Sequence, residues 1–241
     1  MPEPEVWIDE GVSGRSTSSK RPERKRTGRT STTKVDVDMP QLVELVGPRR
    51  AERLQQRLGE AAEAFSGERF GEARQILSPI AREAPDLAEA RELYGLTLYR
   101  LGRWKEAARE LEAFVELSGG STEQHPVLAD CRRALKQYRE VERLWEELRE
   151  ASPSGPLMAE GRIVAAGALA DQGDLAAAIR LLSKGFRLPK HPGEHHLRRA
   201  YALADLYERA GDLPQARSIF ERIQRAEPDF LDTASRIDGL L

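Results

Sequence analysis

The feature that most constrains the fold of this chain is an internal period of 34 residues. Aromatic residues recur at this interval as Phe70, Trp104 and Tyr138. Small residues and helix breakers recur at the same interval, as Ala73 and Ala107, and as Pro85, Gly119 and Pro153. Three kinds of residue at fixed offsets of this length are typical of stacked helical hairpins. The sequence therefore predicts repeated helix pairs and, with them, a binding surface with no catalytic pocket.

Between the breakers, apolar residues recur three and four positions apart, as they do on one face of a helix. This spacing predicts five helical hairpins, which begin near Leu54, Ala88, Thr122, Ala159 and Leu197. The later repeats are longer, since Gly173 and Gly211 lie 38 residues apart, and the extra residues fall in the loop 187–194. An amphipathic segment from Phe230 to Leu240 is expected to cap the end of the stack.

The N-terminal 38 residues differ in composition from the rest of the chain. Residues 1–38 are rich in Ser, Thr, Lys, Arg and Pro, and we expect them to form a disordered arm. Residues 13–34 carry eight basic residues and one acid, whereas the formal net charge of the whole chain is −2. A basic arm is therefore attached to an acidic helical repeat domain, residues 39–241. In that domain we expect a turn of helix at Met39–Val46 and a long helix from Pro48 to about Ser66.

The repeats resemble the tetratricopeptide repeat, in which a Trp-x-x-Leu-Gly-x-x-Tyr stretch is followed by Ala-x-x-x-Phe and then Pro. The second unit has Tyr94-Gly95-x-x-Leu98 and Ala107-x-x-x-Leu111, and the fifth has Leu203-Ala204-x-x-Tyr207, Ala216-x-x-x-Phe220 and Pro228. The resemblance covers about residues 54–230. It implies an all-α, right-handed α-solenoid of about five hairpins with a C-terminal capping helix. The composition, rich in Ala, Arg, Leu and Glu, is also similar to that of uncharacterised actinobacterial repeat proteins. This similarity implies no known activity.

The small residues of the motif are explained by helix packing. The third unit departs from the motif. Small residues such as Gly95 and Ala107 are expected to let neighbouring helices approach closely. In the third unit Val141 replaces a small residue and Lys136 replaces the turn glycine. We therefore expect the helices of that unit to follow the pattern less closely.

The resemblance implies that the first helices of successive hairpins line a concave groove, and that the protein is a non-enzymatic scaffold or adaptor. Aromatic and Arg side chains in the groove would anchor a peptide or helix of a partner protein. The residues predicted to line it are Leu58, Phe65, Glu92, Leu96, Tyr99, Arg100, Asp130, Arg133, Ile163, Arg198, Tyr201 and Asp205. An alternative for these residues is that some of them pack between the hairpins and do not line the groove. The identity of the partner and the oligomeric state do not follow from the sequence.

The basic arm gives a second interpretation, an RNA- or ribosome-associated accessory protein. The residues that would contact phosphates are Lys20, Arg21, Arg24, Lys25, Arg26 and Arg29. The arm lacks interleaved aromatic residues for base stacking. A solubilising tail, or a tail that binds the acidic body, explains the same charges, so these alternatives stay open.

Sequence signals of catalysis are missing. The chain has no glycine-rich phosphate loop, no Gly-x-Ser-x-Gly and no His-Glu-x-x-His, so we expect neither an enzyme nor a cofactor. Cys131 falls in a helical period and is expected to be a buried structural residue. His191, His195 and His196 cluster, but Pro-Gly at 192–193 interrupts the helix that would give them the spacing of metal ligands. A single cysteine, no apolar run of about 18 residues and a polar N-terminus predict a cytoplasmic protein without a membrane span.

Overall fold

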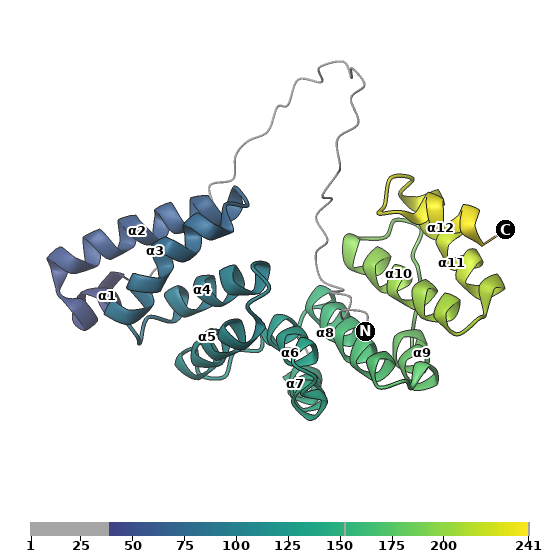
Figure 1. The fold of residues 1–241 in the computed structure, drawn as a ribbon, viewed down its shortest axis with the longest axis horizontal. Helices are drawn as coiled ribbons and strands as arrows, with labels where there is room; N and C mark the ends of the chain where they lie inside the picture. Colours follow the sequence, from purple (N-terminus) through teal and green to yellow (C-terminus); the bar gives the residue numbers. More distant parts are fainter. Residues whose placement is uncertain (1–38, 152, 241) are drawn as a thin grey trace, which may run out of the picture. The chain divides into compact units, whose positions relative to one another are not determined.

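The computed structural model describes residues 39–151 and 153–240, and all the regular secondary structure in these ranges is helical (Figure 1). The helices are α1 (Met39–Val46), α2 (Pro48–Ser66), α3 (Phe70–Glu83), α4 (Ala88–Arg100), α5 (Trp104–Leu117), α6 (His125–Ala134), α7 (Tyr138–Ala151), α8 (Gly155–Asp171), α9 (Leu175–Ser183), α10 (Glu194–Arg209), α11 (Leu213–Ala226) and α12 (Thr233–Gly239). The prediction of an all-α fold is confirmed. The predicted disordered arm (1–38) lies outside the described residues.

The described residues fall into two compact units, the N-terminal unit (39–120) and the C-terminal unit (121–240). In the N-terminal unit α2 pairs with α3 and α4 pairs with α5, as two helical hairpins. Helix α1 packs on α2, and α3 packs on α4. The core between these helices is built mainly of leucine and alanine, and Leu54, Leu77 and Leu111 are fully buried or nearly so. Each buried leucine stabilises the fold by roughly 1.5–3 kcal/mol.

The C-terminal unit contains three further hairpins, α6–α7, α8–α9 and α10–α11. Helix α8 packs on α6, α7 and α10, so the first helix of one hairpin contacts both helices of the hairpin before it. Helix α12 packs on α11, and Ile237 on this helix and Leu240 just after it pack against the core, as expected of a capping segment. Phe220 on α11 is fully buried in this core, next to Ala200 and Ala204 of α10.

All five hairpins turn in the same way. One residue of each turn has a left-handed backbone, and the helix that follows begins two residues later. These residues are Glu68 (φ 58°), Gly102 (φ 70°), Lys136 (φ 58°), Gly173 (φ 89°) and Gly211 (φ 80°). The amide after each of them donates to the carbonyl five residues earlier, as Arg103 does to Leu98 at 2.9 Å. Only glycine adopts this backbone without strain, so two of the five turns carry an unfavourable residue.

Small residues bring the helices close together, as predicted. A Cβ at Gly95 on α4 would lie 2.7 Å from two carbon atoms of Leu111 on α5, so the two helices meet at a glycine. Ala73 and Ala107 are fully buried at the equivalent positions of α3 and α5. In the third hairpin Val141 is buried in the same role, and α6 and α7 still form a regular pair.

The connection between α9 and α10 is long and irregular. It runs from Lys184 to Gly193 and contains the extra residues that lengthen this repeat. Figure 1 shows it passing along the side of the helices before α10 begins. Phe186 and Leu188 of this loop pack against the core of the C-terminal unit, so the loop is attached to the helices along its length.

Candidate partner-binding surface

In the N-terminal unit, the predicted groove residues of α2 lie in or next to the core. Leu58 is fully buried, and Phe65 is half-buried. Phe65 meets Phe70 of α3 edge to face, with ring centroids 5.4 Å apart. The same contact recurs 34 residues later between Tyr99 and Trp104, at 5.3 Å. These aromatic pairs pack across the turns of the α2–α3 and α4–α5 hairpins.

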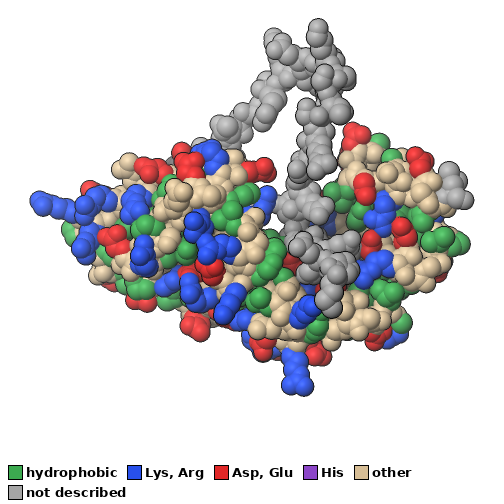
Figure 2. Space-filling view, viewed as in Figure 1, with side chains coloured by type: hydrophobic (Ala, Val, Ile, Leu, Met, Phe, Trp, Pro, Cys, Tyr) green, Lys and Arg blue, Asp and Glu red, His purple; other side chains and the backbone are tan. Residues whose placement is uncertain are grey.

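One of the groove residues predicted on α4, Arg100, links the two hairpins of this unit. The Arg100 guanidinium lies 4.4 Å from the centre of the Phe70 ring and 3.9 Å from the carboxylate of Glu68. Arg100 therefore joins the end of α4 to the turn of the preceding hairpin. Glu92 and Leu96 are half-buried on the same helix. Charged side chains of both signs are interspersed over α2–α5 on the face drawn in Figure 2.

In the C-terminal unit, Arg133 connects α6 to α8. Its Nε donates to Oδ2 of Asp171 at 2.6 Å and its Nη2 donates to Oδ1 at 3.1 Å. Asp130, one turn earlier on α6, lies 3.5 Å from the same guanidinium. Both Asp130 and Arg133 are buried. This is a two-pronged Arg–carboxylate contact, the geometry that gives such pairs their strength and direction.

A second contact of the same kind connects α8 to α10. Arg198 donates from Nε to Oε1 of Glu160 at 2.8 Å and from Nη2 to Oε2 at 3.1 Å. Each of these side chains is 22% exposed. Ile163, one turn after Glu160 on α8, is buried in the core.

A third set of contacts connects α10 to α12. Arg236 donates from Nη2 to Asp205 and to Glu208, both at 2.8 Å. Tyr201 donates its hydroxyl hydrogen to Asp232 at 2.5 Å, and its oxygen accepts from Arg236 at 3.2 Å. Burial opposes the charge of Arg236, but the hydrogen bonds to Asp205 and Glu208 outweigh it and raise its pKa. The pKa of Tyr201 is raised too, by burial first and then by its hydrogen bond to Asp232.

The first helices α6, α8 and α10 thus share one surface, on which bridges between Arg and carboxylate groups join each helix to the next. We call it the first-helix surface. The sequence predicts five of its residues, Asp130, Arg133, Arg198, Tyr201 and Asp205, but not their partners on neighbouring elements. The partners are Glu160, Asp171, Glu208, Asp232 and Arg236. One signal was available, since Arg133–Asp171 and Glu160–Arg198 both have the 38-residue spacing of the longer repeats.

The single cysteine predicted to be structural is accounted for by packing. Cys131 is fully buried, as predicted, and burial raises the pKa of its thiol, so it is not a reactive nucleophile. In the ranges 39–151 and 153–240 no three His, Cys, Asp or Glu side chains come together as metal ligands would. None of the helices described there has the length and apolar character to cross a bilayer.

Comparison with known proteins identifies the repeats. Sequence models of the tetratricopeptide repeat match residues 58–122, 128–192 and 169–237. The chain belongs to the tetratricopeptide repeat family. The crystal structure of a thermophilic tetratricopeptide repeat protein of Thermus thermophilus is similar, with a TM-score of 0.59 at 20% sequence identity. The match covers 78% of this chain and 98% of that one, and shows a common α-solenoid fold. No curated protein matches the chain.

Membership of this family sets the general class of function. Tetratricopeptide repeats generally mediate protein–protein interactions, and proteins built from them are typically scaffolds without catalytic activity. The family therefore points to protein partners for this chain.

Proposed function

We propose that the protein is a non-enzymatic scaffold or adaptor that binds a peptide or helix of a partner protein. In this proposal the ligand lies on the first-helix surface of the C-terminal unit, across α6, α8 and α10. The protein works in the cytoplasm, in keeping with its single, buried cysteine.

The observation that carries the proposal is the fixed register of the first helices. Three sets of charged contacts join α6 to α8, α8 to α10 and α10 to α12. A surface held in this way loses little conformational freedom when a ligand binds, which favours affinity. Arg198 and Tyr201 are of the residue types that contribute most at protein interfaces, and both keep part of their surface exposed.

The charges of this surface suggest the ligand's character. Glu160 and Arg198 lie side by side and are equally exposed, so the surface presents both signs within one contact. A polar segment with side chains of both charges matches it better than a uniformly acidic or basic one. A uniformly charged chain would meet a like charge at the Glu160–Arg198 bridge, which disfavours its binding.

The experiment reverses the charge pattern and keeps the bridge. The full-length double variant Glu160→Arg with Arg198→Glu retains an ion pair between α8 and α10 but exchanges the two signs. The matched control exchanges Arg217 and Glu221 on α11, a half-buried pair with Nε and Oε1 2.9 Å apart. Each protein is used as bait in lysate of the source organism, with and without nuclease, and the bound proteins are quantified by mass spectrometry.

The proposal expects partner proteins that bind the wild type and the α11 control, survive nuclease treatment, and are lost from the Glu160/Arg198 exchange. Equal melting temperatures of the two exchanges show that both are folded. An identical set of partners in all three baits would overturn the proposed surface. Partners that disappear with nuclease in every bait would point instead to nucleic acid as the ligand, through residues such as Lys20 and Arg24 of the arm.

A further inference from the structure

A basic pocket of about 250 Å³ opens in the C-terminal unit between the start of α8, the start of α10 and the loop 184–193. Two of its lining residues, Ala159 and Arg199, are the sequence neighbours of Glu160 and Arg198, but neither of these bridge residues lines it. The polar side chains that line it carry positive charge or are histidines, with one aromatic ring beside them: Arg162, Arg187, Arg199, His195, His196 and Phe186.

Two of these arginines are fixed by backbone carbonyls at the end of α9. Arg199 donates from Nε and Nη2 to the carbonyl of Leu182, at 3.0 and 2.6 Å, and from Nη2 to that of Lys184 at 2.7 Å. Arg162 donates from Nη1 to the same Lys184 carbonyl, at 2.9 Å. Both guanidinium groups are thus held at one point of the chain by neutral acceptors, which leave their positive charges uncompensated.

Aromatic rings add to the positioning of these two groups. The Arg199 guanidinium lies 5.6 Å from the centre of the Phe186 ring, and that of Arg162 lies 5.7 Å from the centre of the Trp145 ring. Such contacts orient a guanidinium group without neutralising it. The two arginines therefore have fixed directions in the absence of a ligand.

The pocket lacks the carboxylates that accompany other arginines of this unit. Within the described residues, no Asp or Glu pairs with Arg162, Arg187 or Arg199, whereas Arg133, Arg198 and Arg236 each bond a carboxylate. Burial, and then the charge of Arg162, lower the pKa of Arg199 to about 10. Two like charges held together in a partly buried site disfavour each other unless an anion joins them.

The histidines supply a further donor. They occupy the first turn of α10, with ring centroids 3.9 Å apart, and the amide of Gly193 donates to Nδ1 of His196 at 3.2 Å. A neutral imidazole that accepts at Nδ1 carries its hydrogen at Nε2, where it can donate to a ligand. The nearby carboxylate of Glu160 is occupied by Arg198, which bonds both of its oxygen atoms.

The surrounding sequence is basic in an otherwise acidic body. Residues 184–199 contain five Lys or Arg residues, one Glu, and three of the four histidines of the chain, which has a formal net charge of −2. The N-terminus of α10, which is the positive end of its helix dipole, also lies at the pocket. Geometry and composition therefore both favour a compact anion.

We propose that this pocket binds a phosphate monoester group. A phosphate dianion matches this lining. After its bonds to the carbonyls, Arg199 has the hydrogens of Nη1 left to donate, Arg162 has the Nε and Nη2 donors of one edge, and an imidazole N–H lines the same pocket. At roughly 30 Å³ for each water molecule displaced, the pocket has room for the phosphoryl group and the carbon chain that bears it. Phe186 and Met158 provide an apolar wall for that chain. Neither Glu160 nor Arg198 lines the pocket, so the two proposals are tested with different residues.

The test measures binding to the full-length protein by isothermal titration calorimetry. The probes are inorganic phosphate, N-acetyl-phosphoserine amide, its unphosphorylated form, and a phosphoserine-containing peptide. We expect binding of the phosphorylated probes and none of the unphosphorylated form. Loss of one charged donor, in Arg162→Gln, is expected to weaken binding about 10- to 100-fold.

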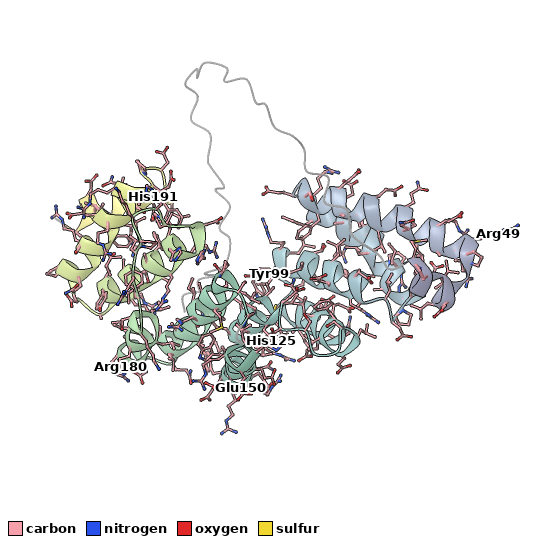
Figure 3. All side chains as sticks on the ribbon, turned by 180° about the vertical axis from the view of Figure 1, so that it is seen from behind. Arg49, Tyr99, His125, Glu150, Arg180 and His191 are labelled. Atoms are coloured by element: carbon pink, nitrogen blue, oxygen red, sulfur yellow. The ribbon has the colours of Figure 1, made fainter. Side chains whose placement is uncertain are left out.

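The control is Arg180→Gln, which removes an exposed positive charge from α9 (Figure 3) at a residue that does not line the pocket. It is expected to leave binding unchanged. If Arg162→Gln lowers the melting temperature, Arg187→Gln gives the same comparison, since Arg187 is exposed and lies on the loop. No binding of any phosphorylated probe, or an equal loss in Arg180→Gln, would overturn the proposal.

The probes also separate two sources of the same group. A peptide that binds more tightly than N-acetyl-phosphoserine amide assigns the phosphate to a modified side chain of a partner protein. Equal binding of the two assigns it to a small phosphate ester. Either result supports the pocket as a phosphate monoester site.

Discussion

Arg133 on α6 and Asp171 on α8 form a two-pronged bridge, and the Arg133 guanidinium packs against Gly167 of α8. The guanidinium is almost completely buried, with 2% of the side chain exposed, against 18% for Asp171. A Cβ at Gly167 would lie 2.8 Å from Cζ of Arg133, so the absence of a side chain there makes room for the guanidinium. Gly167 and Asp171 are one turn apart on α8, and the helix thus provides both the space and the counter-charge.

Removal of the counter-charge is expected to destabilise the C-terminal unit. Asp171→Asn leaves the buried Arg133 with a weaker acceptor, and should lower the free energy of unfolding by about 2–3 kcal/mol. Urea denaturation followed by circular dichroism measures the change. Asp238→Asn, an exposed carboxylate on α12, is the control and should change it by less than about 0.5 kcal/mol. An equal, small effect of both substitutions would show that Arg133 does not depend on Asp171.

The turn of the third hairpin offers a stabilising substitution. Lys136 has a φ of 58°, where the equivalent residues of three other hairpins are glycines. Lys136→Gly should relieve the strain and raise the free energy of unfolding by about 0.5–1 kcal/mol, the strain relief being partly offset by the greater freedom of glycine in the unfolded chain. The reverse change, Gly173→Ala, should lower it by about 1–2 kcal/mol. Thermal melts of both variants check the two signs, and a destabilised Lys136→Gly would contradict the argument.

Two glycines in the N-terminal unit should respond to alanine in opposite ways. A Cβ at Gly95 would lie 2.7 Å from side-chain atoms of the fully buried Leu111, so Gly95→Ala should cost about 1–3 kcal/mol. Gly71 lies on α3 with nothing within 4 Å of such a Cβ, so Gly71→Ala should stabilise by about 0.5–1 kcal/mol. Guanidinium denaturation of the two variants gives both values. Similar shifts in both would mean that helix propensity, and not the contact with Leu111, decides the outcome.

The helices could be predicted because their signals are local. Phe70, Trp104 and Tyr138, the aromatic ladder of the sequence, are the first residues of α3, α5 and α7. A left-handed turn residue stands two positions before each of them, including Lys136, which the sequence marks only as a missing glycine. Helix breakers and the helical spacing of apolar residues depend only on nearby residues. Because these signals recur at the same positions of each repeat, the sequence predicts the helix boundaries.

The surfaces could be predicted only in part, because they depend on which helices lie next to one another. Helix position alone suggested Arg198, but its partner Glu160 lies on another helix, 38 residues earlier. The basic pocket depends on the path of the loop that brings Phe186 and Arg187 to the start of α10, and no periodic pattern specifies that path. The spacing of the repeats therefore predicts neither which side chains pair between helices nor the path of an irregular loop.

His125, the first residue of α6, should make stability depend on pH (Figure 3). Its ring is buried, and its Nε2 lies 3.1 Å from Oε2 of Glu147 on α7. Burial lowers the pKa of His125, and the charge of Arg143 adds to the lowering, while the hydrogen bond to Glu147 opposes it. In the unfolded chain the same group has its ordinary pKa, about 6.5.

The unfolded state therefore binds more protons than the folded state between these two pKa values. The stability contributed by a neutral His125 is complete above about pH 6.5 and is lost as the pH falls through the lower, folded pKa. His125→Gln should flatten this part of the profile of unfolding free energy against pH, measured by urea denaturation between about pH 5 and 8. His191→Gln, a change in the exposed loop, should leave the wild-type slope. Parallel profiles for the wild type and His125→Gln would show that this buried histidine does not set the acid limit of stability.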